Sequence, residues 1–171
     1  MGEMIVGKGT YGTPIRKGNM NNVVIGNYCS IAGNCILDCG WQHNIKLITT
    51  YPFNQLRSEF SHINSHPVCK GDIIIGNDVW IGEDCIINSN VKIGNGAVVG
   101  SRSIVTKDIE DYAIVAGSPA KFIRKRFSDE QIKKLLEIKW WDWEDRKINE
   151  NVQMLMNENI DEFIKLHQIF T

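Results

Sequence analysis

The chain has 171 residues, of which 43% are hydrophobic and 23% charged, so it can bury a core and has the composition of neither a disordered nor a membrane protein. Its formal net charge of -1 excludes a strongly basic surface, and we expect no nucleic-acid partner. No apolar run is long enough to span a bilayer, the first ten residues hold no signal-peptide core, and the five cysteines form no CxxC motif, so we expect a cytoplasmic protein with reduced thiols.

An aliphatic residue returns every six positions along two stretches of the chain. These anchor residues are Ile25, Ile31, Leu37, Ile75, Ile81, Ile87, Ile93, Val99 and Val105, with a weaker copy at Val6. A small or apolar residue stands two positions before each anchor of the two runs, and glycine often follows the anchor. A period of six fits a short strand with a tight turn, three of which close one coil of a parallel β-helix. We expect the anchor to point inward and the next residue to turn the corner, with an alternating β-sandwich as the weaker alternative.

The same six-residue period predicts that three of the cysteines are buried. Cys29, Cys35 and Cys85 fall two positions before an anchor. We expect them inside the triangular prism that the stacked coils form, where a thiol behaves as a small apolar group. Cys39 and Cys69 lie outside the regular runs, and their positions stay open.

The repeat stops between its two runs, and we expect an excursion loop over about 41–72. A long excursion from a regular scaffold is usually either functional or a packing arm. This one carries three of the four histidines of the chain: His43, His62 and His66.

The end of the chain has a different composition, because glycine and proline are absent after residue 127. A capping box, Ser128-Asp129-Glu130-Gln131, predicts a helix start, and further amphipathic stretches run to about Met156 and over 160–169. Trp140, Trp141 and Trp143 are expected to pack rather than to bind a ligand. We therefore divide the chain into a β-helix domain over 1–127 and a helical extension over 128–171.

Several motifs together carry a family resemblance. They are Val6 to Gly12, His43 with Tyr51-Pro52-Phe53, Asp78 to Gly82, Ala116 to Lys121, and Lys139 to Trp143. They resemble the hexapeptide-repeat xenobiotic acyltransferases, which include streptogramin and type B chloramphenicol acetyltransferases and many polysaccharide O-acetyltransferases. The resemblance covers nearly the whole chain and implies a mainly β fold, a left-handed parallel β-helix with C-terminal α-helices. It also implies an acetyltransferase that uses acetyl-CoA and no metal, and a homotrimer with its sites between subunits.

The resemblance assigns candidate site residues as well. It makes His43 the general base, since a neutral imidazole can take the proton of an acceptor hydroxyl during direct transfer, without an acyl-enzyme. Coenzyme A is then expected to contact residues in and after the last coil, where cations suit its phosphates: Ser101, Thr106, Lys107, Lys121 and Arg124. Tyr11 and Trp80 are expected to border the acceptor, although Trp80 is equally suited to pack the excursion onto the prism.

The acceptor and three rival readings stay open at this point. A sugar hydroxyl of a surface polysaccharide or its precursor is the first choice, an antibiotic such as chloramphenicol or a streptogramin the second, and an amino sugar the third. A zinc hydratase of the γ-carbonic-anhydrase type would need His43, His62 and His66 as ligands, but that family places its ligands on the coils. The second rival is an acyltransferase that forms an acyl-cysteine on Cys39, which lies close to His43 in the sequence. The third is a scaffold without catalytic activity.

Overall fold

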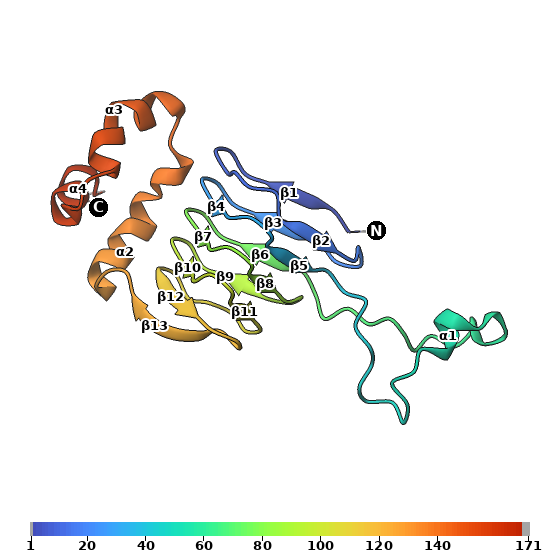
Figure 1. Ribbon diagram of the computed structural model, residues 1–171. Coiled ribbons are helices and arrows are strands. Elements are labelled where there is room, and N and C mark those ends of the chain that lie inside the picture. Colours follow the sequence, from blue (N-terminus) through green and yellow to red (C-terminus); the bar gives the residue numbers. More distant parts are fainter. Residues whose placement is uncertain (1, 169–171) are drawn as a thin grey trace.

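The computed structural model describes residues 2–168 and consists of a triangular prism of β coils with an arm on one side and helices on the other (Figure 1). Each side of the prism is one sheet. Sheet A contains β1 (Met4–Val6), β3 (Val23–Ile25), β6 (Ile73–Ile75) and β9 (Lys92–Ile93) in that order. Sheet B runs from β4 (Ser30–Ile31) through β7 (Trp80–Ile81), β10 (Val98–Val99) and β12 (Ala113–Ala116) to β13 (Lys121–Lys125). Sheet C contains β2 (Ile15–Lys17), β5 (Ile36–Asp38), β8 (Ile86–Ile87) and β11 (Ile104–Val105).

The strands pair with those one coil above and below, as the period of six predicts. Within the three sheets of the described chain every pairing is parallel except β12 with β13, the strand that closes the prism. The registers keep the anchors in columns, for example Ile31 beside Ile81 and Ile81 beside Val99. The predicted mainly β fold of parallel coils with C-terminal helices is therefore confirmed.

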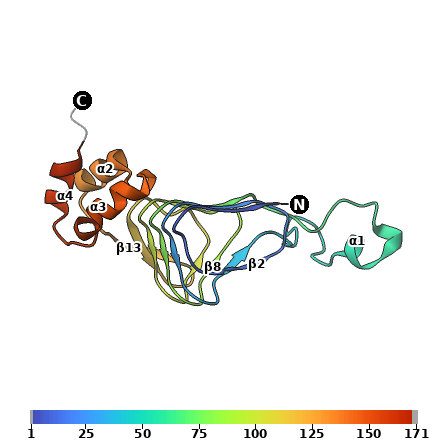
Figure 2. The ribbon, with the colours of Figure 1, turned by 90° about the horizontal axis from the view of Figure 1, so that it is seen from above.

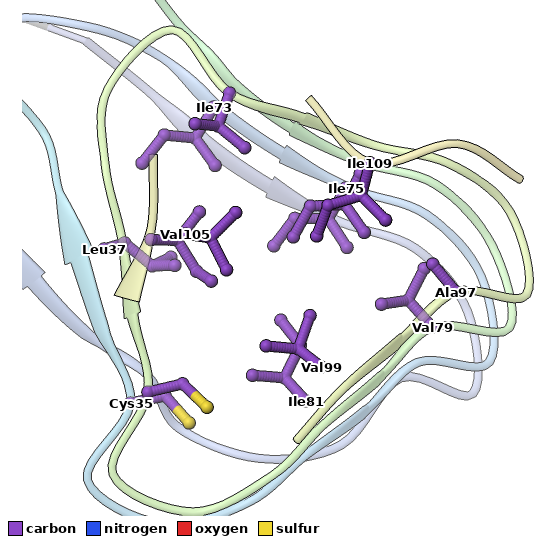
Figure 3. Close-up of a cluster of buried hydrophobic side chains, with 14 of the residues drawn as sticks. Cys35, Leu37, Ile73, Ile75, Val79, Ile81, Ala97, Val99, Val105 and Ile109 are labelled. Atoms are coloured by element: carbon purple, nitrogen blue, oxygen red, sulfur yellow. The ribbon is translucent and has the colours of Figure 1, made fainter. Parts of the chain in front are cut away.

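The anchors form the core of the prism. All nine in the two runs are buried, and the labelled ones Leu37, Ile81 and Val105 point toward the centre of the triangle in Figure 3. Cys29, Cys35 and Cys85 are fully buried, which confirms their predicted interior positions, and Cys39 is buried with them. Val6 keeps the register but is 48% exposed, because its coil lies at the end of the prism.

The physical reason for the glycine after an anchor differs from the one predicted. The left-handed backbone occurs three positions after the anchor, as at Asp78 and Asp84, while the glycines that follow the anchors do not adopt it. A Cβ on Gly26 would instead lie 2.6 Å from the carbonyl oxygen of Gly76 in the next coil, and one on Gly82 would lie 2.6 Å from the amide nitrogen of Ser101. These glycines are required because consecutive coils stack too closely for a side chain, so the expectation that a special turn conformation selects glycine there was wrong.

A ladder of side-chain amides lines the corner between sheets A and B. The backbone N–H of Asn27 donates to Oδ1 of Asn77 at 2.7 Å, and that of Asn77 donates to Oδ1 of Asn95 at 3.0 Å. Asp111 continues the ladder, accepting from the N–H of Asn95 at 2.6 Å. The ladder supplies partners for turn amides that the strands leave unpaired, and it therefore holds successive coils in register.

The excursion arm, residues 41–72, leaves the prism after β5 of sheet C and returns at β6 of sheet A. It contains a short helix, α1 (Phe53–Leu56), and a 3₁₀ turn (Ser58–Phe60). An isolated antiparallel bridge joins Gln42 to Val68 at its base. The predicted excursion is thus confirmed, and both figures of the fold show it projecting away from the coils (Figures 1 and 2).

Three helices cover the corner between sheets A and B: α2 (Asp129–Ile138), α3 (Asp145–Leu155) and α4 (Ile160–His167). The predicted capping box is present, with Ser128 as the N-cap of α2. Trp141 and Trp143 are buried in one cluster with Tyr112 of the prism, which confirms their predicted packing role. Of the helical stretch predicted over 160–169, Ile169 lies outside the described residues. None of the helices described is both long and apolar enough to cross a membrane. The boundary between domains at 127/128 stays a prediction.

Candidate active site

The outer face of sheet B brings together residues that the sequence predicts for two different ligands. Trp80 pairs with Val98, Val98 with Ile114, and Ile114 with Arg124, so these outward side chains form one row across the sheet. Tyr11 joins the same sheet through a bridge to Ser30, the neighbour of Trp80. The row lines a hollow of about 490 Å³. A predicted acceptor residue and a predicted coenzyme residue therefore border a single hollow.

An ion pair that sequence reasoning missed lies at the edge of this hollow. Nη1 of Arg126 is 3.1 Å from Oδ2 of Asp78 and also donates to the carbonyl oxygen of Gly96 at 2.8 Å. Burial raises the pKa of the Asp78 carboxyl, and the neighbouring guanidinium only partly offsets this effect. Arg126 is thus occupied within its own chain, whereas Arg124 is exposed and faces the hollow.

The remaining predicted coenzyme residues lie on the last coil and do not share this hollow. Ser101 is on the turn between sheets B and C, and Thr106 begins the turn after sheet C. Lys107 lines a second hollow of about 360 Å³ at the end of the prism, together with Phe122. Lys121 opens β13, the same strand as Arg124. All of these side chains are exposed, so the chain presents a cationic, accessible end rather than a closed coenzyme cavity.

The candidate base lies on the arm. The side chain of His43 is exposed, and its Nδ1 is 2.5 Å from the carbonyl oxygen of Thr50. A carbonyl oxygen only accepts hydrogen bonds, so this contact requires a proton on Nδ1. In the neutral ring Nε2 then carries a lone pair, which makes it the atom that can take a proton from a substrate.

His43 and the sheet B face lie on different sides of the prism. The arm leaves from the corner between sheets C and A, and sheet B is the side opposite that corner (Figure 2). Trp80 is 56% exposed and lines the sheet B hollow, so within one chain it does not pack the arm onto the prism. One chain therefore separates the candidate base from the candidate acceptor and coenzyme residues.

Comparisons with known proteins agree with this arrangement of elements. A family model described as bacterial transferase hexapeptide (six repeats) matches residues 72–107. The chain is 44% identical over 146 residues to a chloramphenicol acetyltransferase from Klebsiella aerogenes, covering 83% of this chain and 70% of the relative. It is 42% identical to a probable macrolide acetyltransferase from Lysinibacillus sphaericus, covering 81% of this chain and 79% of the relative. A solved structure of a polySia-specific acetyltransferase is 30% identical with a TM-score of 0.51, covering 75% of this chain and 51% of that one.

The chain belongs to the hexapeptide-repeat xenobiotic acyltransferases. As a member of this family it is a left-handed parallel β-helix and an acetyltransferase with acetyl-CoA as its co-substrate. The predicted family, fold, enzyme class and co-substrate are confirmed.

Two rival readings bear on the histidines and cysteines of this acyltransferase. Among residues 2–168 no group of three or more His, Cys, Asp or Glu side chains is placed to hold a metal ion. His66 is buried while His62 is exposed. Cys39 is fully buried, and desolvation raises the pKa of its thiol despite the opposing effect of Arg16. A buried thiol with a raised pKa is a poor nucleophile, which argues against an acyl-cysteine.

Replacing Cys39 with alanine is therefore expected to leave kcat within about twofold of the wild-type value, because direct transfer needs no thiolate. The measurement is thiol release from acetyl-CoA at saturating acceptor, with the melting temperature recorded to correct for the lost buried sulfur. A loss of two orders of magnitude in a folded C39A protein would instead favour an acyl-cysteine intermediate.

Proposed function

We propose that this protein transfers an acetyl group from acetyl-CoA to a hydroxyl group, with Nε2 of His43 as the general base. The observation that carries the proposal is the contact between Nδ1 of His43 and the Thr50 carbonyl, because it selects the tautomer whose Nε2 can accept a proton. The acceptor oxygen loses its proton to Nε2 as it attacks the thioester carbonyl. The carbon–sulfur bond then breaks, and the proton returns to the departing sulfur, which gives free coenzyme A.

The proposed site lies between subunits of a homotrimer. In one chain the candidate base and the sheet B hollow are on different sides of the prism, so a second copy must supply one of them. The arm also exposes a set of large apolar side chains that a neighbour would cover: Ile45, Leu47, Ile48, Tyr51, Phe53, Leu56 and Ile63. Sheet A carries a further exposed apolar row in which Ile5 pairs with Val24 and Val24 with Ile74. Contiguous apolar surface of this kind is typical of subunit interfaces.

Coenzyme A would then lie along the last coils of the prism. Arg124 and Lys121 on β13 and Lys107 on the preceding turn are exposed cations that suit its phosphates, and Ser101 and Thr106 offer hydroxyls near the same end. This role for the five residues remains a proposal. The five free thiols suit a reducing compartment, and we place the enzyme in the cytoplasm on that ground.

A sugar hydroxyl is the first candidate acceptor. The hollow beside Trp80 has the exposed guanidinium of Arg124 on its lining, which offers several N–H donors to the hydroxyls of a sugar, while Asp78 and Arg126 at its edge are paired with each other. One of the solved relatives is a polySia-specific acetyltransferase. The second candidate is an antibiotic hydroxyl, which the names of the chloramphenicol and macrolide acetyltransferase relatives favour.

The test is thiol release from acetyl-CoA against a panel of hexoses, amino sugars, chloramphenicol and a streptogramin. Turnover on a sugar with none on the antibiotics would support the first candidate, and the reverse would establish the second. N-acetylated product from an amino sugar alone would contradict O-transfer. Binding of acetyl-CoA, measured by calorimetry in the same samples, separates a missing acceptor from a protein that is only a scaffold.

A further inference from the structure

A second histidine of the arm, His66, contacts the candidate base from a buried position. His66 is 3% exposed, and its ring centroid is 5.2 Å from that of His43 at an interplanar angle of 58°. The rings thus belong to one packed unit at the base of the arm. The contact gives the exposed His43 ring a fixed neighbour on one side.

The hydrogen bonds of His66 fix its protonation state and its place. The backbone N–H of Asn44 donates to Nδ1 of His66 at 3.0 Å, so this nitrogen is unprotonated and the proton of the neutral ring is on Nε2. The carbonyl oxygen of His66 accepts from Nδ2 of Asn54 at 2.6 Å and from Nε2 of Gln55 at 2.8 Å. The residue is therefore held through both its ring and its backbone.

This arrangement excludes His66 as the base itself. Its Nδ1 is occupied by the Asn44 amide, and its Nε2 is buried, protonated and without a partner among residues 2–168. What His66 does reach is the backbone of Asn44, the residue directly after His43. Anchoring that amide restrains the backbone from which the His43 side chain projects. The Thr50 carbonyl restrains the His43 ring itself through its contact with Nδ1.

We infer that His66 is a positioning residue, which through its Nδ1 acceptor and its ring holds His43 in the orientation that presents Nε2 to the acceptor. The inference rests on the proposed role of His43 as the base. The orientation of His43 should affect the rate, because a misplacement of about 1 Å in a catalytic group can cost about 10²-fold in rate.

The experiment compares two amide substitutions at this position. Asparagine places its oxygen near the Nδ1 position and can still accept from the Asn44 amide, whereas glutamine places its amide group near Nε2 and leaves that N–H unpaired. We expect H66N to retain at least about a third of the wild-type kcat, and H66Q to lose about 10–100-fold in kcat with KM for acetyl-CoA within about twofold. H62Q, an exposed histidine of the same arm, is the matched control and should leave both constants unchanged.

A direct readout keeps this inference separate from the identity of the base. In protein labelled with ¹⁵N-histidine, the nitrogen shifts of His43 should report a proton on Nδ1 in the wild type and in H66N, and a mixture of tautomers in H66Q. The pair H43A/H66Q should be no slower than H43A alone, because positioning acts only through His43. If H43A keeps its turnover, the proposed function fails while the tautomer shifts still decide the role of His66. Equal kcat and unchanged His43 shifts in H66Q would overturn the inference.

Discussion

Replacing His43 with alanine is expected to lower kcat by about 10²–10⁴-fold, the usual contribution of a positioned general base. The thioester is already activated, so the chemical demand on the protein is to remove the acceptor proton as the oxygen attacks. Nε2 of His43 is available for this because the Thr50 carbonyl holds the proton on Nδ1. The binding of acetyl-CoA should change little, since the candidate coenzyme residues lie on the prism and not on the arm. Steady-state thiol release gives kcat, and calorimetry gives the affinity for acetyl-CoA.

The matched control is H62A, because His62 is an exposed histidine of the same arm that contacts neither His43 nor His66 among the interactions described. H62A should retain wild-type turnover. A folded H43A protein with undiminished kcat would show that the base is elsewhere, and a parallel loss in H62A would point to a damaged arm rather than to a lost proton acceptor.

The fold followed from the sequence because its determinant is local and repeated. A period of six in aliphatic residues is compatible with few structures, and every anchor in the two runs is buried as expected. The physical reason for the glycines was wrong, since the close approach of Gly26 to the next coil depends on the spacing between coils rather than on the turn itself. The sequence contained a signal for the amide ladder, because Asn27, Asn77 and Asn95 each stand two positions after an anchor and therefore recur at the same corner of successive coils.

The site was less accessible from sequence, because its parts come together through long-range packing. The resemblance identified Trp80 and Arg124, but only the strand register shows that they share one face. In the basic run 121–126, sequence alone does not distinguish Arg126, which pairs with Asp78 48 residues away, from Arg124, which stays exposed. The link between His43 and His66 likewise depends on how the arm closes at its base, and a spacing of residues does not report this.

Mixing two inactive variants is expected to restore activity if the site lies between subunits. One variant is H43A, which lacks the base, and the other is W80A/R124E, which lacks the aromatic wall and a cation of the sheet B face. We expect the face variant to lose about 10²-fold in kcat/KM, because a hydrogen bond to a charged group contributes about 1.5–3 kcal/mol and the contact of a bound acceptor with the Trp80 ring adds to it. Each variant alone should therefore be nearly inactive.

In a trimer whose sites combine the arm of one subunit with the face of the next, random mixing at equal ratio leaves about one quarter of the sites with both parts intact. Co-expression of the two variants with different tags, followed by purification on both tags, removes the inactive homotrimers. Each remaining mixed trimer has one intact site of three, so the sample should recover about a third of wild-type activity. Co-expression of H43A with H43A/W80A/R124E controls for assembly and should recover nothing, because no subunit carries His43. A site built within one chain gives no recovery in either mixture, since each chain would then contain at least one broken part. The experiment distinguishes a site between subunits from a site within one chain whatever the natural acceptor is, because any acceptor that supports wild-type turnover can be used to measure the recovered activity.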